Sequence, residues 1–175
     1  MPRLTSPRLP CLAIFLLAAT SIGATPALAD TRETLGWIEE GLVMPEKTRV
    51  KFKLDTGALT SSMHAEKIER FERDGDDWVR FTLELEDIER DKEVETRLER
   101  KVVRTIKVRG AGGAEERPVV MMKVCLGNRI HEAQFSLNDR DKMNYPVLIG
   151  RRLLENVGPV DAARTFTREP SCKAG

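Results

Sequence analysis

Residues 50–58 read Val-Lys-Phe-Lys-Leu-Asp-Thr-Gly-Ala, and this stretch decides the fold of the chain. Its apolar residues alternate with two lysines, and a period of two predicts a strand with one buried face. The strand ends at Asp55, Thr56 and Gly57. A carboxylate beside a buried strand is costly unless it is paired or functional, but these three residue types are also common in turns. The stretch therefore leaves two interpretations open, an ordinary turn and a catalytic loop.

The first 29 residues have the layout of a cleaved secretory signal. Two arginines precede an apolar run from Cys11 to Ala19, and Ala27-Leu28-Ala29 has small residues where a signal peptidase would cut. The apolar run is shorter than the roughly 20 residues that a membrane-spanning helix needs. We expect a mature chain that begins at Asp30, a periplasmic or secreted location, and no stable membrane anchor. An uncleaved anchor is the alternative.

Residues 30–175 have the composition of one globular domain. The signal removes two of the 29 basic residues and none of the 28 acidic ones, so the net charge becomes 27 − 28 = −1. A charge near zero argues against nucleic acid as a partner. Cys125 and Cys172 remain, and an exported protein can join them in a disulfide. Sequence alone does not show that they meet.

The mature chain reads as short strands joined by turns. A first strand is expected between Leu35 and Val43, with a turn near Gly41, and Asp74-Gly75 and Gly127-Asn128 are turn signals. Regular spacing of short strands predicts a mainly β fold, a closed or partly open barrel of six to eight strands with one short C-terminal helix. The other expected strands cover residues 68–71, 79–85, 102–108, 119–126, 133–137, 145–150 and a last one from 160, and the helix covers 151–155.

Two segments between these strands have unusual composition. Residues 86–101 are almost entirely charged, which predicts a solvated loop or a frayed helix, with a docking surface for a charged partner as the alternative. Residues 109–114 are rich in glycine and lie between strand-like runs, so they predict a long hairpin. They are not a dinucleotide-binding loop, because no helix pattern follows the glycines.

Three segments together resemble the retropepsin-like aspartic peptidases, the single-domain relatives of pepsin. Residues 52–58 resemble the catalytic strand and loop of that family, and residues 109–118 fall where the family keeps its flap hairpin. Residues 147–151, Val-Leu-Ile-Gly-Arg, resemble the segment that packs beside the catalytic loop and opens the helix. The resemblance covers about Leu35 to Asp161, nearly all of the mature chain.

The pattern is also similar to a bacterial group labelled both as ATP-dependent zinc proteases and as retropepsin-like aspartic endopeptidases. The matching segments are residues 55–65, 116–120 and 143–151. The chain contains neither an HExxH helix nor a P-loop, so the zinc and ATP parts of that label find no support. We therefore expect no cofactor and no metal.

The resemblance implies roles for individual residues. Asp55 would be catalytic, with Thr56 bracing the opposing loop and Gly57 letting the two loops touch. Because the chain has one Asp-Thr-Gly, a homodimer would supply the second aspartate. The resemblance also implies structural support from Ile149, Gly150 and Arg151, and peptide contacts from Ala58 and from flap glycines, namely Gly110, Gly112 and Gly113.

Other polar residues have weaker claims on a site. Asp139 and Asp161 are rival acids for a dyad within one chain, although a turn and a strand end are their ordinary environments. His64 and His131 are the only histidines, and with Asp55 or a cysteine they are candidate metal ligands, although two histidines far apart in sequence are more often surface or core residues. Arg117 and Arg151 are candidates for pairing with carboxylates near the loop, and plain surface charge is the other interpretation.

The leading hypothesis is a periplasmic, homodimeric aspartic endopeptidase acting on a peptide or protein substrate. One alternative is a non-catalytic module of the same fold that grips an extended peptide by strand addition. The other is a zinc-dependent hydrolase.

Overall fold

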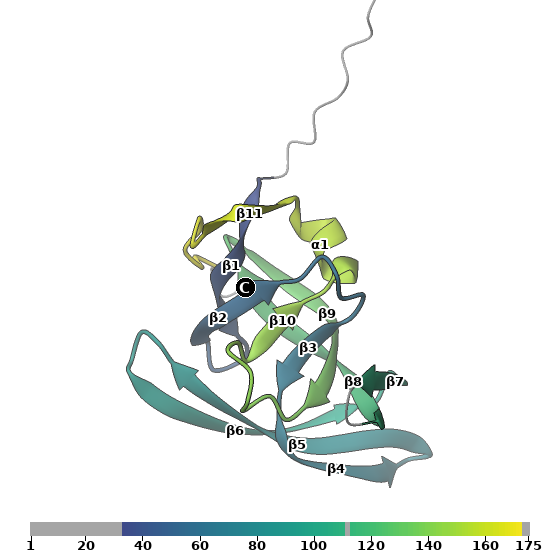
Figure 1. Ribbon diagram of the computed structural model, residues 1–175. Helices are drawn as coiled ribbons and strands as arrows, with labels where there is room; N and C mark the ends of the chain where they lie inside the picture. Colours follow the sequence, from purple (N-terminus) through teal and green to yellow (C-terminus); the bar gives the residue numbers. More distant parts are fainter. Residues whose placement is uncertain (1–32, 111–112, 173–175) are drawn as a thin grey trace, which may run out of the picture. The chain divides into compact units, whose positions relative to one another are not determined.

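The computed structural model describes residues 33–110 and 113–172, and strands dominate them (Figure 1). The predicted signal, residues 1–29, lies outside the described residues. One helix, α1, is present in the described part of the chain, as expected. In chain order the elements are β1 (Leu35–Val43), β2 (Thr48–Leu54), β3 (Ser61–His64), β4 (Glu66–Arg73), β5 (Asp76–Asp87), β6 (Lys92–Lys101), β7 (Arg104–Gly110), β8 (Gly113–Leu126), β9 (Arg129–Asn138), β10 (Val147–Ile149), α1 (Arg151–Val157) and β11 (Val160–Thr165).

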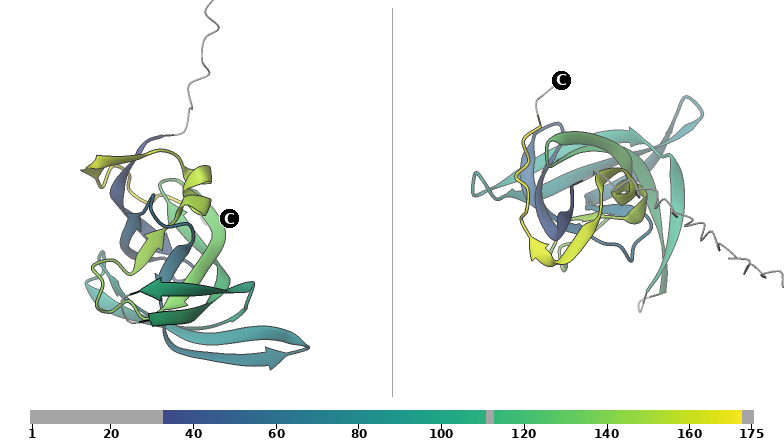
Figure 2. Two further views of the ribbon diagram at one scale, coloured as in Figure 1. Left: turned by 45° about the vertical axis from the view of Figure 1, so that its right-hand side comes forward. Right: turned by 90° about the horizontal axis from the view of Figure 1, so that it is seen from above.

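Six strands close into a ring. Their order is β1-β2-β10-β3-β9-β8, and β1 pairs with both β2 and β8, so the sheet returns to its first strand. In the view from above in Figure 2 these strands curve around a common centre. β11 adds to β1 in parallel, and β7 extends the sheet from β8. The predicted barrel of six to eight strands is confirmed.

The core lies inside the ring and continues under a second sheet of three strands, β4-β5-β6. Phe52, Met63, Phe135 and Ile149 are completely buried within the ring. Phe81 from β5 is equally buried and belongs to the same cluster. Burying each such side chain is worth about 1.5–3 kcal/mol, so the two sheets are held together chiefly by this shared core.

The turn expected near Gly41 is wrong. Gly41 lies inside β1, opposite Val50 of β2. A Cβ at Gly41 would overlap the ring of Phe52, so glycine is needed there to admit the phenylalanine and not to turn the chain. The turn follows Val43, at residues 44–47.

The loop or frayed helix expected at residues 86–101 is also wrong, because most of it forms β6, paired along its length with β5. The charges on β6 find partners across the strands: Lys101 Nζ lies 2.6 Å from Asp76, and Glu99 lies 2.7 Å from Arg80. The alternative docking role for this segment stays a prediction.

The expected turns at Asp74-Gly75 and Gly127-Asn128 join β4 to β5 and β8 to β9. The hairpin expected at residues 109–114 joins β7 to β8, with residues 111 and 112 outside the described part. Among the residues that the structure describes, no helix has the length and apolar character needed to cross a bilayer.

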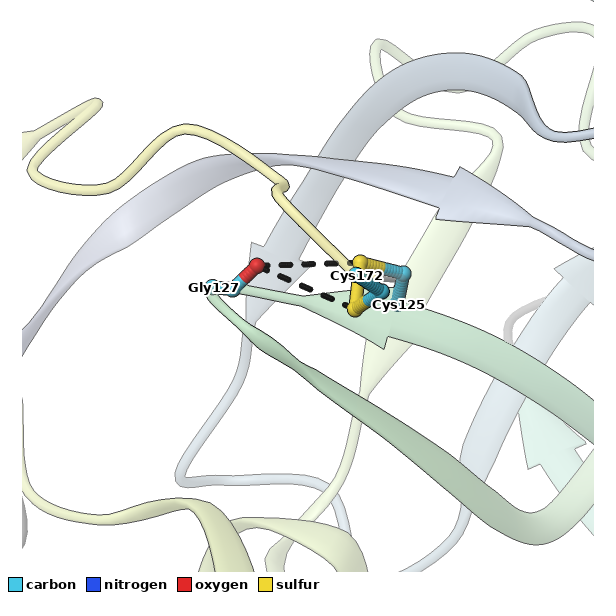
Figure 3. The surroundings of a disulfide bond; sticks show 3 residues. All are labelled: Cys125, Gly127 and Cys172. Carbon is cyan, nitrogen blue, oxygen red and sulfur yellow. Dashed lines mark hydrogen bonds between the residues drawn. A yellow bond between two sulfur atoms is a disulfide. The ribbon is translucent and has the colours of Figure 1, made fainter. Parts of the chain in front are cut away.

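Cys125 and Cys172 form a disulfide (Figure 3). Their sulfurs lie 3.6 and 3.8 Å from the carbonyl oxygen of Gly127. The bond ties the segment after β11 to the end of β8. It also settles the pairing that sequence left open.

Candidate functional site

The site is built where β10 lies between β2 and β3. β10 runs parallel to β2, with Ile149 opposite Leu54, and antiparallel to β3. The chain leaving β2 must therefore cross the end of β10 before it returns as β3. Asp55 begins this crossing, and its N–H donates to the carbonyl of Ile149 at 2.8 Å. We call residues 55–60 the Asp55 loop.

Each oxygen of the Asp55 carboxylate has its own partners. Oδ1 accepts hydrogen bonds from the N–H groups of Gly57 (2.9 Å) and Ala58 (3.3 Å). Oδ2 lies 3.1 Å from Nζ of Lys53, and the Asp55 side chain is 23% exposed. The carboxylate is thus oriented by its own loop and still reaches solvent.

These partners decide the ionisation of Asp55. Partial burial acts to raise the pKa of the carboxyl, but the hydrogen bonds from Lys53, Gly57 and Ala58 and the charge of Lys53 outweigh it, so the pKa of Asp55 lies below its ordinary value. In one protomer Asp55 is therefore a carboxylate at neutral pH. A second carboxylate brought beside it would oppose this effect, because two like charges at close range cannot both ionise freely.

Gly150 and Arg151 both contact the Asp55 loop. A Cβ on Gly150 would lie 2.7 Å from the backbone of Thr60, so only glycine lets β10 and the loop pack together. The N–H of Gly150 also donates to Oγ of Ser61 at 3.0 Å. Arg151 then donates from Nη1 to the carbonyls of Thr56 (2.9 Å) and Gly57 (3.0 Å). Arg151 thus bonds loop carbonyls, where the sequence suggested a carboxylate.

The glycine-rich hairpin meets the site through its base. Arg104, at the start of β7, donates to Oγ1 of Thr60 (3.0 Å) and to Oε1 of Gln134 (2.8 Å). At the other end of the hairpin Gly110 pairs with Gly113, while Gly112 lies outside the described residues. The peptide-contact roles of these glycines and of Ala58 stay predictions.

Lys53 and Arg104 were not singled out from the sequence. Lys53 carried a usable signal, since residues two apart on a strand share a face and Lys53 is two residues before Asp55. Arg104 carried none, because its contact with Thr60 depends on how β7 folds back onto the ring.

The rival acids lie elsewhere. Asp139 follows β9 and lies 4.0 Å from Nδ1 of His64, and its side chain is 72% exposed. Asp161 lies on β11 and accepts the N–H of Ala163 at 2.8 Å. Arg117 pairs with Glu115, at 2.6 Å, on its own strand. None of these contacts involves the Asp55 loop.

The two histidines do not form a joint site. His64 is opposite Asn138, the last residue of β9, while His131 lies near the start of that strand. His131 is half-buried, and burial followed by the charge of Arg129 lowers its pKa. A metal site shared by the two histidines is therefore wrong.

His64 does lie beside the carboxylates of Glu66 and Asp141. Each of the three residues has one potential metal-ligating atom within 4.8 Å of the other two. However, Nδ1 of His64 accepts the N–H of Arg140 at 2.9 Å. The neutral ring then carries its proton on Nε2, the nitrogen that faces Asp141 at 3.3 Å. A protonated nitrogen has no lone pair for a metal, so this donor set does not suit a cation.

The closed ring, the crossing loop that begins at Asp55 and the glycine-arginine start of α1 define a retropepsin-like barrel. A family model described as RimB-like, retropepsin-like aspartic endopeptidase RimB, matches residues 34–171. The chain belongs to this family.

Several known proteins are similar to parts of the chain. A probable alpha-L-glutamate ligase of Shewanella pealeana is 36% identical over 118 residues, covering 67% of this chain and 25% of the ligase. A protein with the same name from Desulfotalea psychrophila is 34% identical over 142 residues, covering 72% of this chain and 30% of that protein. The chain thus spans about a quarter of the length of the curated relatives it matches.

A crystal structure shares the fold. It is of protein Lpg0085 from Legionella pneumophila, whose function is unknown, and the two chains superpose with a TM-score of 0.66 at 28% identity. The match covers 78% of this chain and 98% of the Legionella protein. The ligase name belongs to much longer proteins, whereas this solved structure is matched over nearly its whole length.

Proposed function

We propose that this chain is an aspartic endopeptidase that acts as a homodimer with one Asp55 from each copy. The observation that carries the proposal is the Asp55 carboxylate, held by two loop amides at the end of a buried strand. An acid fixed in this way, and partly exposed, is suited to meet a second acid across a two-fold axis.

The exposure of the loop supports a dimer. Thr56 and Gly57 are exposed, and Leu59 is 49% exposed although it is a large apolar residue. The two acids weighed as partners within one chain, Asp139 and Asp161, make their contacts with His64 and Ala163. A second copy of Asp55 is therefore the simplest source of the other carboxylate.

The chemistry follows from two carboxyls that share one proton. The ionised carboxylate takes a proton from a bound water, and the water oxygen bonds to the peptide carbonyl carbon. The protonated carboxyl gives its proton to the carbonyl oxygen. When the C–N bond breaks, the protonated carboxyl gives its proton to the leaving amine, and a hydroxyl of the tetrahedral diol returns one to the other carboxylate as the C=O bond forms again, so the two carboxyls share one proton as before. No covalent bond to the enzyme forms.

We further propose that the protein acts outside the cytoplasm, in the periplasm or as a secreted protein. The signal-like residues 1–29 and the Cys125–Cys172 disulfide support this location, since disulfides persist mainly in oxidising compartments. The relatives' name, probable alpha-L-glutamate ligase, gives no reason to assign ligase chemistry here, because the match covers only a quarter of their length.

The test is cleavage of a proteome-derived peptide library, followed by mass spectrometry of the products. We expect internal cleavage that pepstatin inhibits, and activity per protomer that falls on dilution as the dimer dissociates. Peptide binding without turnover would favour the non-catalytic module instead. Stoichiometric zinc in the purified protein, together with inhibition by chelators, would favour the metal-dependent hydrolase.

Replacing Arg151 with Met is expected to lower kcat about tenfold or more, with a smaller change in KM. The substitution removes two hydrogen bonds to the carbonyls of Thr56 and Gly57, and small displacements of catalytic groups have large effects on rate. Arg152→Met is the matched control, because the neighbouring exposed arginine does not bond those carbonyls. Equal rates for the two variants, measured with one cleaved peptide, would contradict the role of Arg151.

A further inference from the structure

Lys53 contacts the oxygen of Asp55 that the loop amides leave free. Its Nζ lies 3.1 Å from Oδ2, while the N–H groups of Gly57 and Ala58 both point at Oδ1. The Lys53 side chain is 38% exposed, so the pair is shielded from water in part. The ammonium therefore contacts the carboxylate oxygen that receives no hydrogen bond from the loop amides.

The position of Lys53 is fixed by β2 and not by the loop. Phe52 and Leu54 are buried, so Lys51 and Lys53 share the opposite face, and Asp55 continues it. Lys53 is opposite Ile38 of β1 and Leu148 of β10, which hold the strand on both sides. Lys51 is exposed one step farther from Asp55 on the same face, which makes it a natural control.

Charged groups from other elements lie near the Asp55 loop. Arg140, between β9 and β10, is buried, and the charge of Asp55 acts on it, as does that of Arg117 from β8. Its guanidinium bonds the carbonyl of Tyr145 at 3.1 Å. Arg151 of α1 bonds loop carbonyls. Of the cations Lys53, Arg140 and Arg151, Lys53 is the one in contact with the carboxylate.

We propose that Lys53 is a positioning residue of the Asp55 pair and sets the pH range in which the pair holds a single proton. This inference rests on the peptidase function proposed above. In a dimer two lysines would accompany the two carboxyls, one on each strand β2. Each would hold Oδ2 of its own aspartate and offset the repulsion between the two acids.

The direction of the effect follows from linkage. The pair is active with one proton bound, so the rate rises as the first proton leaves and falls as the second leaves. A nearby cation favours the ionised forms and lowers both apparent pKa values. Removing Lys53 therefore shifts both limbs of the pH–rate profile upward.

The experiment compares pH–rate profiles of kcat/KM for wild type, Lys53→Met, Lys53→Arg and Lys51→Met. We expect the Lys53→Met profile to move upward by about 0.5–1 pH unit, since a partly exposed pair is worth at most a modest shift. Lys53→Arg keeps the charge and is expected to restore the wild-type profile. Lys51→Met is expected to leave it unchanged. Superimposable profiles for wild type and Lys53→Met would overturn the inference.

A second measurement does not depend on catalysis. The Asp55 carboxyl is titrated by NMR in protein labelled with carbon-13 at the aspartate side chains, assigned with Asp55→Asn. If the wild type cleaves no peptide at any pH, the proposed function fails, but a higher Asp55 pKa in Lys53→Met than in wild type would still support the pairing. An unchanged Asp55 pKa would overturn it.

Discussion

Replacing Asp55 with Asn is expected to abolish cleavage, lowering kcat by about 10³-fold or more, because the amide can act neither as the base nor as the shared acid. Folding should be nearly unaffected. The amide oxygen can still accept the hydrogen bonds of Gly57 and Ala58, and the lost Lys53 pair is partly exposed and worth about 1 kcal/mol or less. The rate is measured with a peptide that the wild type cleaves, and stability by thermal unfolding.

Two other acidic residues provide the controls for this prediction. Asp139→Asn and Asp161→Asn remove the rival acids, which contact His64 and Ala163, and both variants should cleave at the wild-type rate. Mixed dimers add a sharper test. If one Asp55 comes from each copy, excess Asp55→Asn protein should inhibit wild type by forming inactive heterodimers. Retained cleavage by Asp55→Asn would remove this residue from the mechanism.

The centre of the fold could be predicted because local pattern and tertiary environment agree there. Alternating residues in 50–54 form β2, and the run 147–149 is fully consistent with a strand buried between two neighbours. The resemblance placed Gly150 in a segment that packs beside the loop, and in the structure a Cβ at Gly150 would lie 2.7 Å from the backbone of Thr60. At these positions the local sequence pattern and the packing in the fold require the same structure, so the pattern alone predicts it.

The charged strand β6 could not be predicted because its composition masked its period. Val94, Thr96 and Leu98 are partly buried and alternate with exposed charged residues, and Leu98 packs against the core. From its composition alone, the segment resembles a solvated loop, because most of its residues are charged. Its strand state depends on partners in β5 such as Asp76 and Arg80, and cross-strand pairs of opposite charge are not visible until the register is known.

The candidate site, too, could be predicted only in part from the sequence. Asp55, Gly57 and Arg151 belong to local motifs, so sequence could point to them. The carboxylate's own partners, Lys53, Gly57 and Ala58, are also local, whereas other groups around the loop come from the assembled fold. Arg104 reaches Thr60 from the start of β7, and Arg140 lies near Asp55 although 85 residues separate them, 140 − 55 = 85. Such contacts follow from the path of the barrel, so no spacing rule predicts them.

Removing the disulfide is expected to give the largest loss of stability. Cys125 and Cys172 are 47 residues apart, and the chain-entropy model assigns such a crosslink about 4 kcal/mol. Cys125→Ala with Cys172→Ala should therefore lower the midpoint of thermal unfolding by about 10 °C or more. Without the disulfide, residues 166–172 lose their crosslink to β8. The segment also contacts Glu39, a buried carboxylate that accepts the N–H groups of Thr167 and Arg168, both at 3.1 Å.

The same variant separates the disulfide from other effects of reduction. A reductant should destabilise the wild type to the level of the double variant and leave the double variant unchanged. Because the Asp55 loop is bonded to β10 and α1 and not to residues 166–172, cleavage by the double variant well below its unfolding temperature should match the wild type. A double variant as stable as wild type would show that the Glu39 contacts and the pairing of β11 with β1 hold the C-terminal segment without the crosslink.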